Sequence, residues 1–284
     1  LGWRDHRPPP AKSAAPPVAV AKRKPKPQAK PKAPAQQISK SGIRHSILVT
    51  GSKTAIIGED NAIEWEGPAG SRDGYVLDNG NILITFSREV KEFTRDKKVV
   101  FHYKLAAPNK EISTSQRLKN GHTMVVEMGA KPRIREVAPD GKIAHEVALQ
   151  PETSNTHMQT RMARKLPNGN YLCPHLLAFA IKEYAPDGKV VKVIKTDLEE
   201  IGGRKAENWP FTAVRLPNGH TVANLTHGNK TAIFDADGIP IDTINPGDQV
   251  AGPRTVTWNS DDPDGDYTFK VKAIAEDDSE MAVT

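Results

Sequence analysis

The sequence is poor in cysteine, in aromatic residues and in long apolar runs, and these shortages exclude several classes of protein. Only one cysteine, Cys173, occurs in 284 residues, which excludes an intramolecular disulfide framework and zinc sites built on several thiolates. No run of about 18 apolar residues occurs, so no segment is predicted to cross a bilayer as a helix. The sequence therefore predicts a soluble protein that is stabilised by an apolar core.

Acidic residues are almost missing from the first 45 positions. This segment contains eleven Lys and Arg but one acid, Asp5, so it carries +10, while the rest of the chain carries −4. From Arg7 to Gln37, Pro, Ala and Lys alternate, a composition that favours an extended, solvated tether. No aromatic residue is interleaved with these cations and no amphipathic helical period accompanies them. We therefore interpret residues 1–45 as a disordered linker and expect no nucleic-acid partner.

A repeated pattern occupies residues 46–250. Four segments share a Leu, one spacer residue, Asn-Gly and an alternating apolar run: LDNGNILITF (77–86), LKNGHTMVVE (118–127), LPNGNYLCPH (166–175) and LPNGHTVANL (216–225). Each is followed by a second apolar segment that turns at or near an aspartate and begins at Val90, Ile134, Ile181 or Thr231, and an earlier copy begins at Thr54. The repeats predict that one structural module recurs along the chain.

The turn residues predict the structure of that module. Asn-Gly and Asp-Gly accept positive φ, as the type I′ turns of two-residue hairpins require. Each module is then four antiparallel strands, and successive Asn-Gly pairs lie 41, 48 and 50 residues apart. This is the spacing of propeller blades. The predicted fold is all-β, a β-propeller of five or six four-stranded blades, and a β-helical solenoid with shorter repeats is the alternative.

The segment 251–284 lacks the Leu-x-Asn-Gly pattern. Two strands are expected there, around the Asp-Pro-Asp-Gly sequence at 262–265. The segment either completes a blade by strand exchange or begins a small immunoglobulin-like element. The acid-rich stretch Asp261–Asp266 is interpreted as a solvated turn, with weak calcium binding as the alternative.

The Leu-x-Asn-Gly and Pro-Asp-Gly-Lys-Val-Val repeats resemble those of quinoprotein-like (PQQ-like repeat) and arylsulfotransferase-like propellers of secreted bacterial proteins. The resemblance covers about residues 46–250 and implies a secreted or periplasmic protein. Quinone enzymes of that superfamily carry a Trp on the outer strand of each blade. The equivalent positions here are Trp65, Phe101, His145, Lys192 and Asp242. Because only the first of these is Trp and the aromatic residues end after two modules, we predict no cofactor.

The blade arrangement predicts where ligands bind. If tight turns close one end of each blade, the long connections lie at the other end, where loops present variable chemistry. The candidate ligand-binding residues at this end are His157, Arg161, Arg164, His175, Asn208, Trp209 and His227. Arg161 and Arg164 are expected on an inner strand, facing the channel. A buried arginine needs an anionic partner, either Glu152, Glu183 or Glu207 or a bound sulfate, phosphate or carboxylate.

The sequence supports two functions. The first is a monomeric binding module that takes an anionic small molecule, a glycan or a protein partner at the channel mouth. The second, implied by the resemblance, is an arylsulfotransferase-like enzyme with a histidine nucleophile (His157, His175 or His227) and arginines that stabilise developing charge. Three histidines could in number hold a metal, but their spacing gives no support for this and no metal site is predicted. Whether the protein is an enzyme is left open at this point.

Overall fold

A computed structural model describes residues 45–244, 254–257 and 268–271. They belong to the second of the two units into which the chain divides, Ala35–Thr284. The predicted linker, apart from His45, lies outside the described residues, as does most of the terminal segment 251–284. Within the described ranges, the structure contains no helix with the length and apolarity needed to cross a bilayer.

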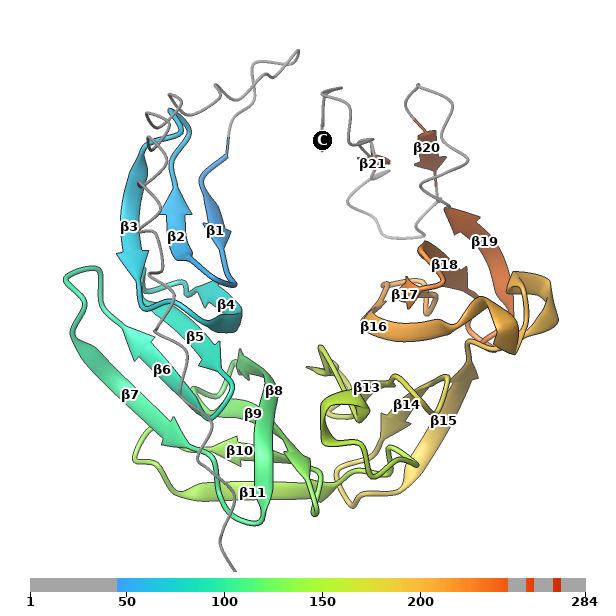
Figure 1. The fold of residues 1–284 in the computed structure, drawn as a ribbon, viewed down its shortest axis with the longest axis horizontal. Helices are drawn as coiled ribbons and strands as arrows, with labels where there is room; N and C mark the ends of the chain where they lie inside the picture. The colour runs from blue at the N-terminus through green and yellow to red at the C-terminus, as the bar shows by residue number, and fades with distance from the viewer. Residues whose placement is uncertain (1–44, 245–253, 258–267, 272–284) are drawn as a thin grey trace, which may run out of the picture. The chain divides into compact units, whose positions relative to one another are not determined.

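The described residues form successive antiparallel sheets whose strand order follows the sequence (Figure 1). The first sheet contains β1 (Ile47–Val49), β2 (Thr54–Ile57) and β3 (Ile63–Gly67). The second sheet contains β4 (Ser71–Val76), β5 (Ile82–Phe86), β6 (Glu89–Phe93) and β7 (Val99–Lys104), and the third contains β8 (Asn109–Arg117), β9 (Thr123–Gly129), β10 (Arg133–Val137) and β11 (Ile143–Ala148). The fourth sheet contains β12 (Arg164–Lys165), β13 (Tyr171–His175), β14 (Ala180–Tyr184) and β15 (Val190–Lys195). The fifth contains β16 (Asn208–Arg215), β17 (Thr221–His227), β18 (Lys230–Phe234) and β19 (Pro240–Ile244). These sheets confirm the predicted β-propeller, and we number its five blades in this order.

Shorter elements complete the described part of the chain. Two strands, β20 (Arg254–Thr257) and β21 (Thr268–Val271), pair with each other. The segment they come from is mostly outside the described residues, so blade completion and an immunoglobulin-like element both stay predictions. Three 3-10 helices lie in the connections between blades: η1 (Thr156–Met158), η2 (Glu199–Ile201) and η3 (Arg204–Ala206).

The Asn-Gly turns form the predicted hairpins, but not with the predicted turn type. In the turn at Leu77, the Gly80 amide donates to the Leu77 carbonyl at 2.8 Å, and the Asn79 side chain accepts from the Asn81 amide at 3.0 Å. Gly80 has a φ of 80°, whereas Asn79 is not among the described residues with positive φ. This is a three-residue loop in which only the glycine is left-handed, so the type I′ expectation was wrong. Asn-Gly is compatible both with a type I′ turn and with this three-residue loop, because the Asn side chain also accepts a hydrogen bond from the backbone amide two residues on.

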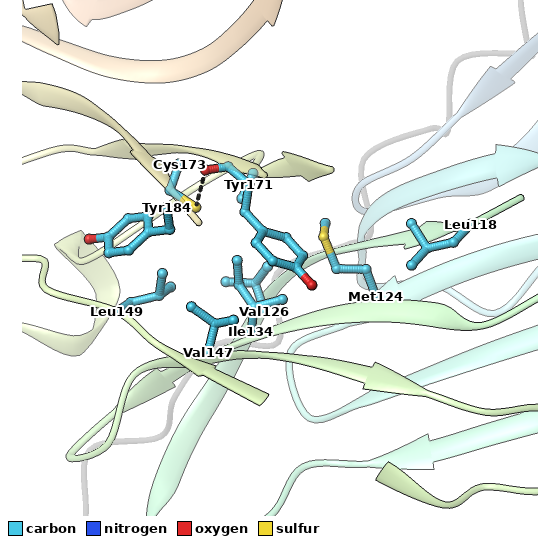
Figure 2. Packing of buried hydrophobic residues seen from close by; sticks show 10 residues of the cluster. Leu118, Met124, Val126, Ile134, Val147, Leu149, Tyr171, Cys173 and Tyr184 are labelled. Atoms are coloured by element: carbon cyan, nitrogen blue, oxygen red, sulfur yellow. Dashed lines mark hydrogen bonds between the residues drawn. The ribbon is translucent and has the colours of Figure 1, made fainter. Parts of the chain in front are cut away.

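Apolar clusters fill the junctions between neighbouring blades. Figure 2 shows the cluster between the third and fourth blades, where Met124 and Val126 of β9 meet Tyr171 and Cys173 of β13. Cys173 is fully buried, and burial raises the pKa of its thiol. The chain therefore builds its core at the blade faces, so that each blade is stabilised by its neighbours.

The third, fourth and fifth blades are each linked to the blade before by an ion pair that repeats. In β6, β10 and β14 a glutamate lies one residue before the end of the strand, and each pairs with a cation at the end of the next blade's first strand. The pairs are Glu92–Arg117 at 2.5 Å, Glu136–Lys165, and Glu183–Arg215 at 2.9 Å. In the first blade Ile56 takes the place of the glutamate, and Val76 takes the place of the cation that follows. We call these three pairs the junction ladder; no repeat motif of the sequence predicts it.

Three of the outer-strand positions that carry Trp in quinone enzymes contact the following blade here. Trp65 meets Phe93 with ring centroids 6.1 Å apart. His145 Nε2 lies 2.9 Å from the Pro186 carbonyl, and Lys192 donates to a carbonyl of the fifth blade. Long polar side chains thus replace the aromatic contact by reaching the backbone of the next Asp-Gly turn.

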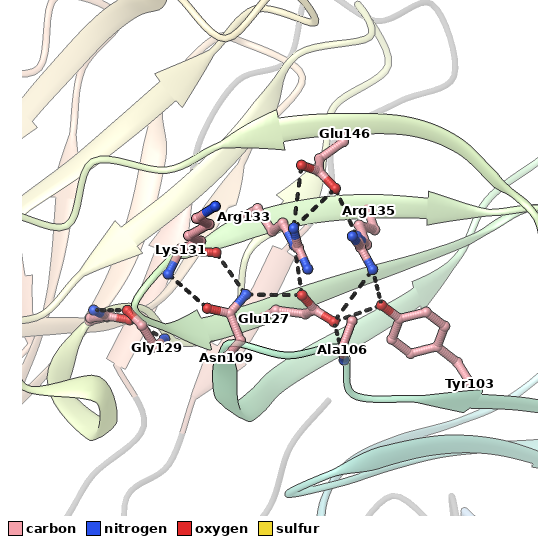
Figure 3. A network of polar contacts seen from close by, with 10 residues as sticks. Tyr103, Ala106, Asn109, Glu127, Gly129, Lys131, Arg133, Arg135 and Glu146 are labelled. Carbon is pink, nitrogen blue, oxygen red and sulfur yellow. Dashed lines mark hydrogen bonds and ion pairs between the residues drawn. The ribbon is translucent and has the colours of Figure 1, made fainter.

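A buried carboxylate, Glu127, ties the connection between β7 and β8 to the third blade (Figure 3). Its oxygens accept from Tyr103 Oη at 2.6 Å, Asn109 Nδ2 at 3.0 Å and Arg133 Nε at 2.7 Å. Burial raises the pKa of Glu127, but these donors outweigh it and hold the pKa below its ordinary value. The charged Glu127 carboxylate and its hydrogen-bond donors therefore hold this connection in place.

Candidate functional site

The candidate site lies where the first strands of the second and third blades meet the segment that precedes β12. We call it the channel-mouth cluster. Its residues are Arg72, Asp73, Glu111, His157, Arg161 and Arg164. First strands of neighbouring blades contact one another, as the bond from Arg72 Nη1 to the Ile112 carbonyl at 3.1 Å shows, so they line the propeller axis. The cluster is at the end of these strands opposite the Asn-Gly turns.

One carboxylate oxygen contacts both Arg72 and His157. Glu111 Oε2 lies 2.7 Å from Arg72 Nη2 and 3.1 Å from His157 Nδ1. Burial raises the pKa of Glu111, but the bonds from His157 and Arg72 lower it further, and the net result is a pKa below the ordinary value. The imidazole of His157 is 61% exposed. Glu111 is therefore a charged group that holds His157 in the open part of the mouth.

A second carboxylate lies deeper in the cluster. Asp73 accepts from the hydroxyl of Thr114 and from the Gly74 amide at 2.9 Å, and Arg164 Nη2 lies 3.8 Å from its Oδ2. Arg164 Nη1 also donates to Thr114 Oγ1 at 3.0 Å. Burial outweighs these contacts and raises the pKa of Asp73. Arg164 is thus positioned by the chain's own acid and hydroxyl.

Arg161 differs from the other two arginines, because it forms no ion pair with a carboxylate of the described residues. It is 9% exposed. Its Nη1 donates to the Thr160 carbonyl at 3.1 Å and to Met128 Sδ at 3.6 Å. Nε and Nη2 have no hydrogen-bond partner in the described part of the chain. Burial, and then the nearby charge of Arg72, lowers the pKa of Arg161, and the charge of Glu111 opposes this only in part.

No described hydrogen bond or ion pair joins His175 to a side chain of this cluster. Its Nδ1 lies 2.6 Å from Thr160 Oγ1 and its Nε2 lies 2.8 Å from Tyr184 Oη. The ring is fully buried, and burial lowers its pKa to about 3. His175 is a neutral imidazole with both nitrogens engaged, so it organises the fourth blade instead of facing the mouth.

The three remaining candidates lie together in the fifth blade. Asn208 is fully buried, and its Nδ2 donates to the Ile201 carbonyl at 3.0 Å. Trp209 stacks on His227 with ring centroids 4.0 Å apart and an interplanar angle of 26°. His227 Nδ1 lies 3.1 Å from Glu207 Oε2. These contacts form a second group, and no described contact joins His227 to His157.

The acidic partners of the arginines were predicted wrongly. Glu152 pairs with Lys182 at 2.6 Å, Glu183 with Arg215, and Glu207 with His227. The groups that meet the arginines are Asp73 and Glu111, from the second and third blades. These two acids and Arg72 are not among the residues that the sequence predicts for the site. The only sequence feature that marks them is their position near the beginning of the first strand of a blade.

Cavities also occur at the end that carries the Asn-Gly turns. Two of them, of about 370 and 480 Å³, lie on either side of the segment 116–119. At the opposite end of the blades, a cavity of about 350 Å³ is lined by residues 224–227 and 229–231 and includes His227. The cations beside the first two, Arg117 and Lys165, belong to the junction ladder. We therefore do not assign these two cavities a ligand.

Comparison with known proteins supports the fold. No family model and no curated protein matches the sequence. Among solved structures, a protein of unknown function from Bacteroides caccae is similar at 24% identity and a TM-score of 0.62, over 75% of this chain and 78% of that one. Streptogramin B lyase (14% identity, TM-score 0.52) matches 69% of this chain and 62% of its own. Virginiamycin B lyase from Staphylococcus aureus (17% identity, TM-score 0.52) matches 72% of this chain and 66% of its own. The chain thus spans less than two thirds of the lyases, and the likeness is one of fold alone.

Proposed function

We propose that this protein is a β-propeller binding module that takes an anionic ligand at the channel mouth. The observation that supports the proposal is Arg161, a largely buried arginine with no ion-paired carboxylate in the described part of the chain. Burying a cation without a counter-charge is costly. A ligand oxyanion beside Arg161 would supply that charge.

The free edge of Arg161 suits a two-oxygen anion. Its Nη1 is already bonded to Thr160 and Met128, and what remains is the edge formed by Nε and Nη2. The two N–H groups of that edge run parallel and match the oxygens of a carboxylate, sulfate or phosphate. The neighbouring Arg72 is paired with Glu111, so Arg161 is the arginine there that lacks an ion pair among the described residues.

Thermal denaturation in sodium acetate and in sodium sulfate, against sodium chloride at equal ionic strength, tests this proposal. We expect a saturable rise in melting temperature with the wild type. Arg161→Gln should weaken the apparent affinity at least about tenfold, because it removes a charge-assisted pair of bonds. The affinity of Arg161→Lys should lie between those of the wild type and Arg161→Gln, since lysine keeps the positive charge but lacks the two parallel N–H groups of the guanidinium.

Arg95→Gln is the matched control, because Arg95 is exposed and its Nε bonds the Gly80 carbonyl at the opposite end of the blades. It should bind the anions as the wild type does. Equal stabilisation of wild type and Arg161→Gln by acetate and sulfate would contradict the proposal.

An arylsulfotransferase-like transferase is the second candidate, and His157 favours it. His157 is held by Glu111 at Nδ1, which leaves Nε2 as the nucleophilic nitrogen beside the arginines. His175 is unsuited, since both of its nitrogens are engaged in the interior. One of the fold neighbours is a virginiamycin B lyase in an inactive variant with quinupristin, so propellers of this fold also hold enzymes.

Turnover separates the two candidates. Incubation with an aryl sulfate donor and a phenolic acceptor should release the donor phenol if the protein is a transferase, and His157→Ala should abolish this. Absence of turnover, together with saturable anion binding, favours the module. We also propose export to the periplasm or medium, supported by the resemblance of the repeats to exported propellers. Fractionation of the producing cells tests this location.

A further inference from the structure

The fifth blade presents an aromatic side chain beside Arg161. Phe211 is 37% exposed, and its ring centroid lies 5.8 Å from the guanidinium carbon of Arg161. A parallel bridge pairs Met162 with Thr212, the residues that follow Arg161 and Phe211. The backbone therefore fixes the cation and the ring next to each other. Among the exposed large apolar side chains of the described residues, Phe211 is the one aromatic ring.

A second aromatic group lies on the same strand, β16. Asn208 and Pro210 are buried, whereas Trp209 is partly exposed and Phe211 is exposed. The ladder with β17 is irregular between Pro210 and Thr212, and the exposure of each residue shows that Trp209 and Phe211 both reach the open side of the strand. The ring of Trp209 is stacked on His227, and Glu207 anchors that imidazole. The open side of β16 thus runs from Arg161 past two aromatic side chains.

We infer that the ligand of the channel mouth is an aromatic carboxylate whose carboxylate meets Nε and Nη2 of Arg161 and whose ring covers Phe211. This inference rests on the proposed anion site. A monoanion matches the charge there, because Arg72 is paired with Glu111 and Arg164 lies near Asp73, which leaves Arg161 as the arginine of the cluster without an ion pair among the described residues. A planar carboxylate matches the guanidinium fork. An aromatic ring beside Phe211 buries apolar surface that a small aliphatic acid leaves in water.

The test compares acetate, benzoate and 2-naphthoate by calorimetric titration of the full chain. With the wild type, we expect affinity to rise from acetate to 2-naphthoate by at least about tenfold, given the area an aromatic ring buries. Phe211→Leu should lower the affinity for 2-naphthoate about two- to tenfold and leave that for acetate unchanged. Trp209→Leu should affect 2-naphthoate more than benzoate, because Trp209 lies farther along β16.

Ile239→Ala is the control for a general effect of removing an apolar side chain, since Ile239 is exposed on the turn before β19, away from the mouth. It should bind all three acids as the wild type does. Equal affinities for acetate and 2-naphthoate, both lost in Arg161→Gln, would overturn the aromatic inference and leave the anion site standing. Binding that is unchanged in Arg161→Gln would overturn the anion site itself.

Discussion

At the scale of the residue, burial separates two histidines that the sequence treats alike. His157 is exposed and bonded to a carboxylate, while His175 is enclosed and bonded to two hydroxyl groups. Each lies in or beside a predicted long connection, so sequence position alone does not distinguish them. The difference arises because all of β13 is buried between blades.

His175 should make the protein sensitive to mild acid. Its pKa is lowered by burial to about 3, against 6.5 in the unfolded chain, so between these values the unfolded state binds more protons. The free energy of unfolding should therefore fall by about 1.4 kcal/mol for each pH unit below the unfolded-state pKa. Urea denaturation at a series of pH values from neutral down to about 4 measures this slope. In His175→Gln the slope should be shallower, and an unchanged slope would contradict the assignment.

At the scale of the element, the ion pairs between blades explain a pattern that looks like ordinary surface charge in the sequence. Glu183 has a pKa below its ordinary value: burial raises it, but Asn170, Asn168 and Arg215 lower it by more. The side chains of Glu183 and Arg215 are 8% and 20% exposed. A pair this enclosed costs desolvation, so breaking it and replacing it have different effects.

We expect Glu183→Ile and Arg215→Val each to destabilise the protein by about 3 kcal/mol, because each leaves a charge without its partner. The double variant reproduces the residue types of Ile56 and Val76 in the first two blades and should recover most of the loss. Urea denaturation of the wild type, both single variants and the double variant measures the four unfolding free energies of this double-mutant cycle. Additive losses in the double variant would mean that the two side chains do not act as a pair.

The elements themselves could be predicted from local sequence, but the site could not. Leu-x-Asn-Gly fixes each hairpin within a few residues, so the blades follow from the repeats. The partners of His157 and Arg164 are Glu111 and Asp73, in blades that are far away along the chain. No local pattern encodes which blade's acid meets which blade's cation. The same limit explains why Glu152, Glu183 and Glu207 were assigned wrongly.

At the scale of the whole molecule, the core is divided among the junctions, and Cys173 reports on one of them. Its side chain is fully buried between the third and fourth blades. Ellman's reagent should therefore react with the native protein only as fast as the junction opens. The rate should rise with urea in step with unfolding followed by circular dichroism.

Lys189→Cys provides the comparison, because the side chain of Lys189 is 80% exposed on an Asp-Gly turn. Its new thiol should react at once in the native protein, while Cys173 stays protected. Rapid reaction of Cys173 in the native wild type would mean that the blades separate locally, without unfolding of the whole protein.

The junction ladder has a consequence for how such a protein can be rearranged by recombination. Blades two, three and four each present an acid to the blade that follows, whereas the first presents Ile56 and the fifth has Ile233 in the corresponding position. Transplanting the first blade into the middle would set an aliphatic group against a guanidinium or an ammonium. The blades are similar in shape but are not interchangeable, because the side chains at each junction determine which blade can follow which.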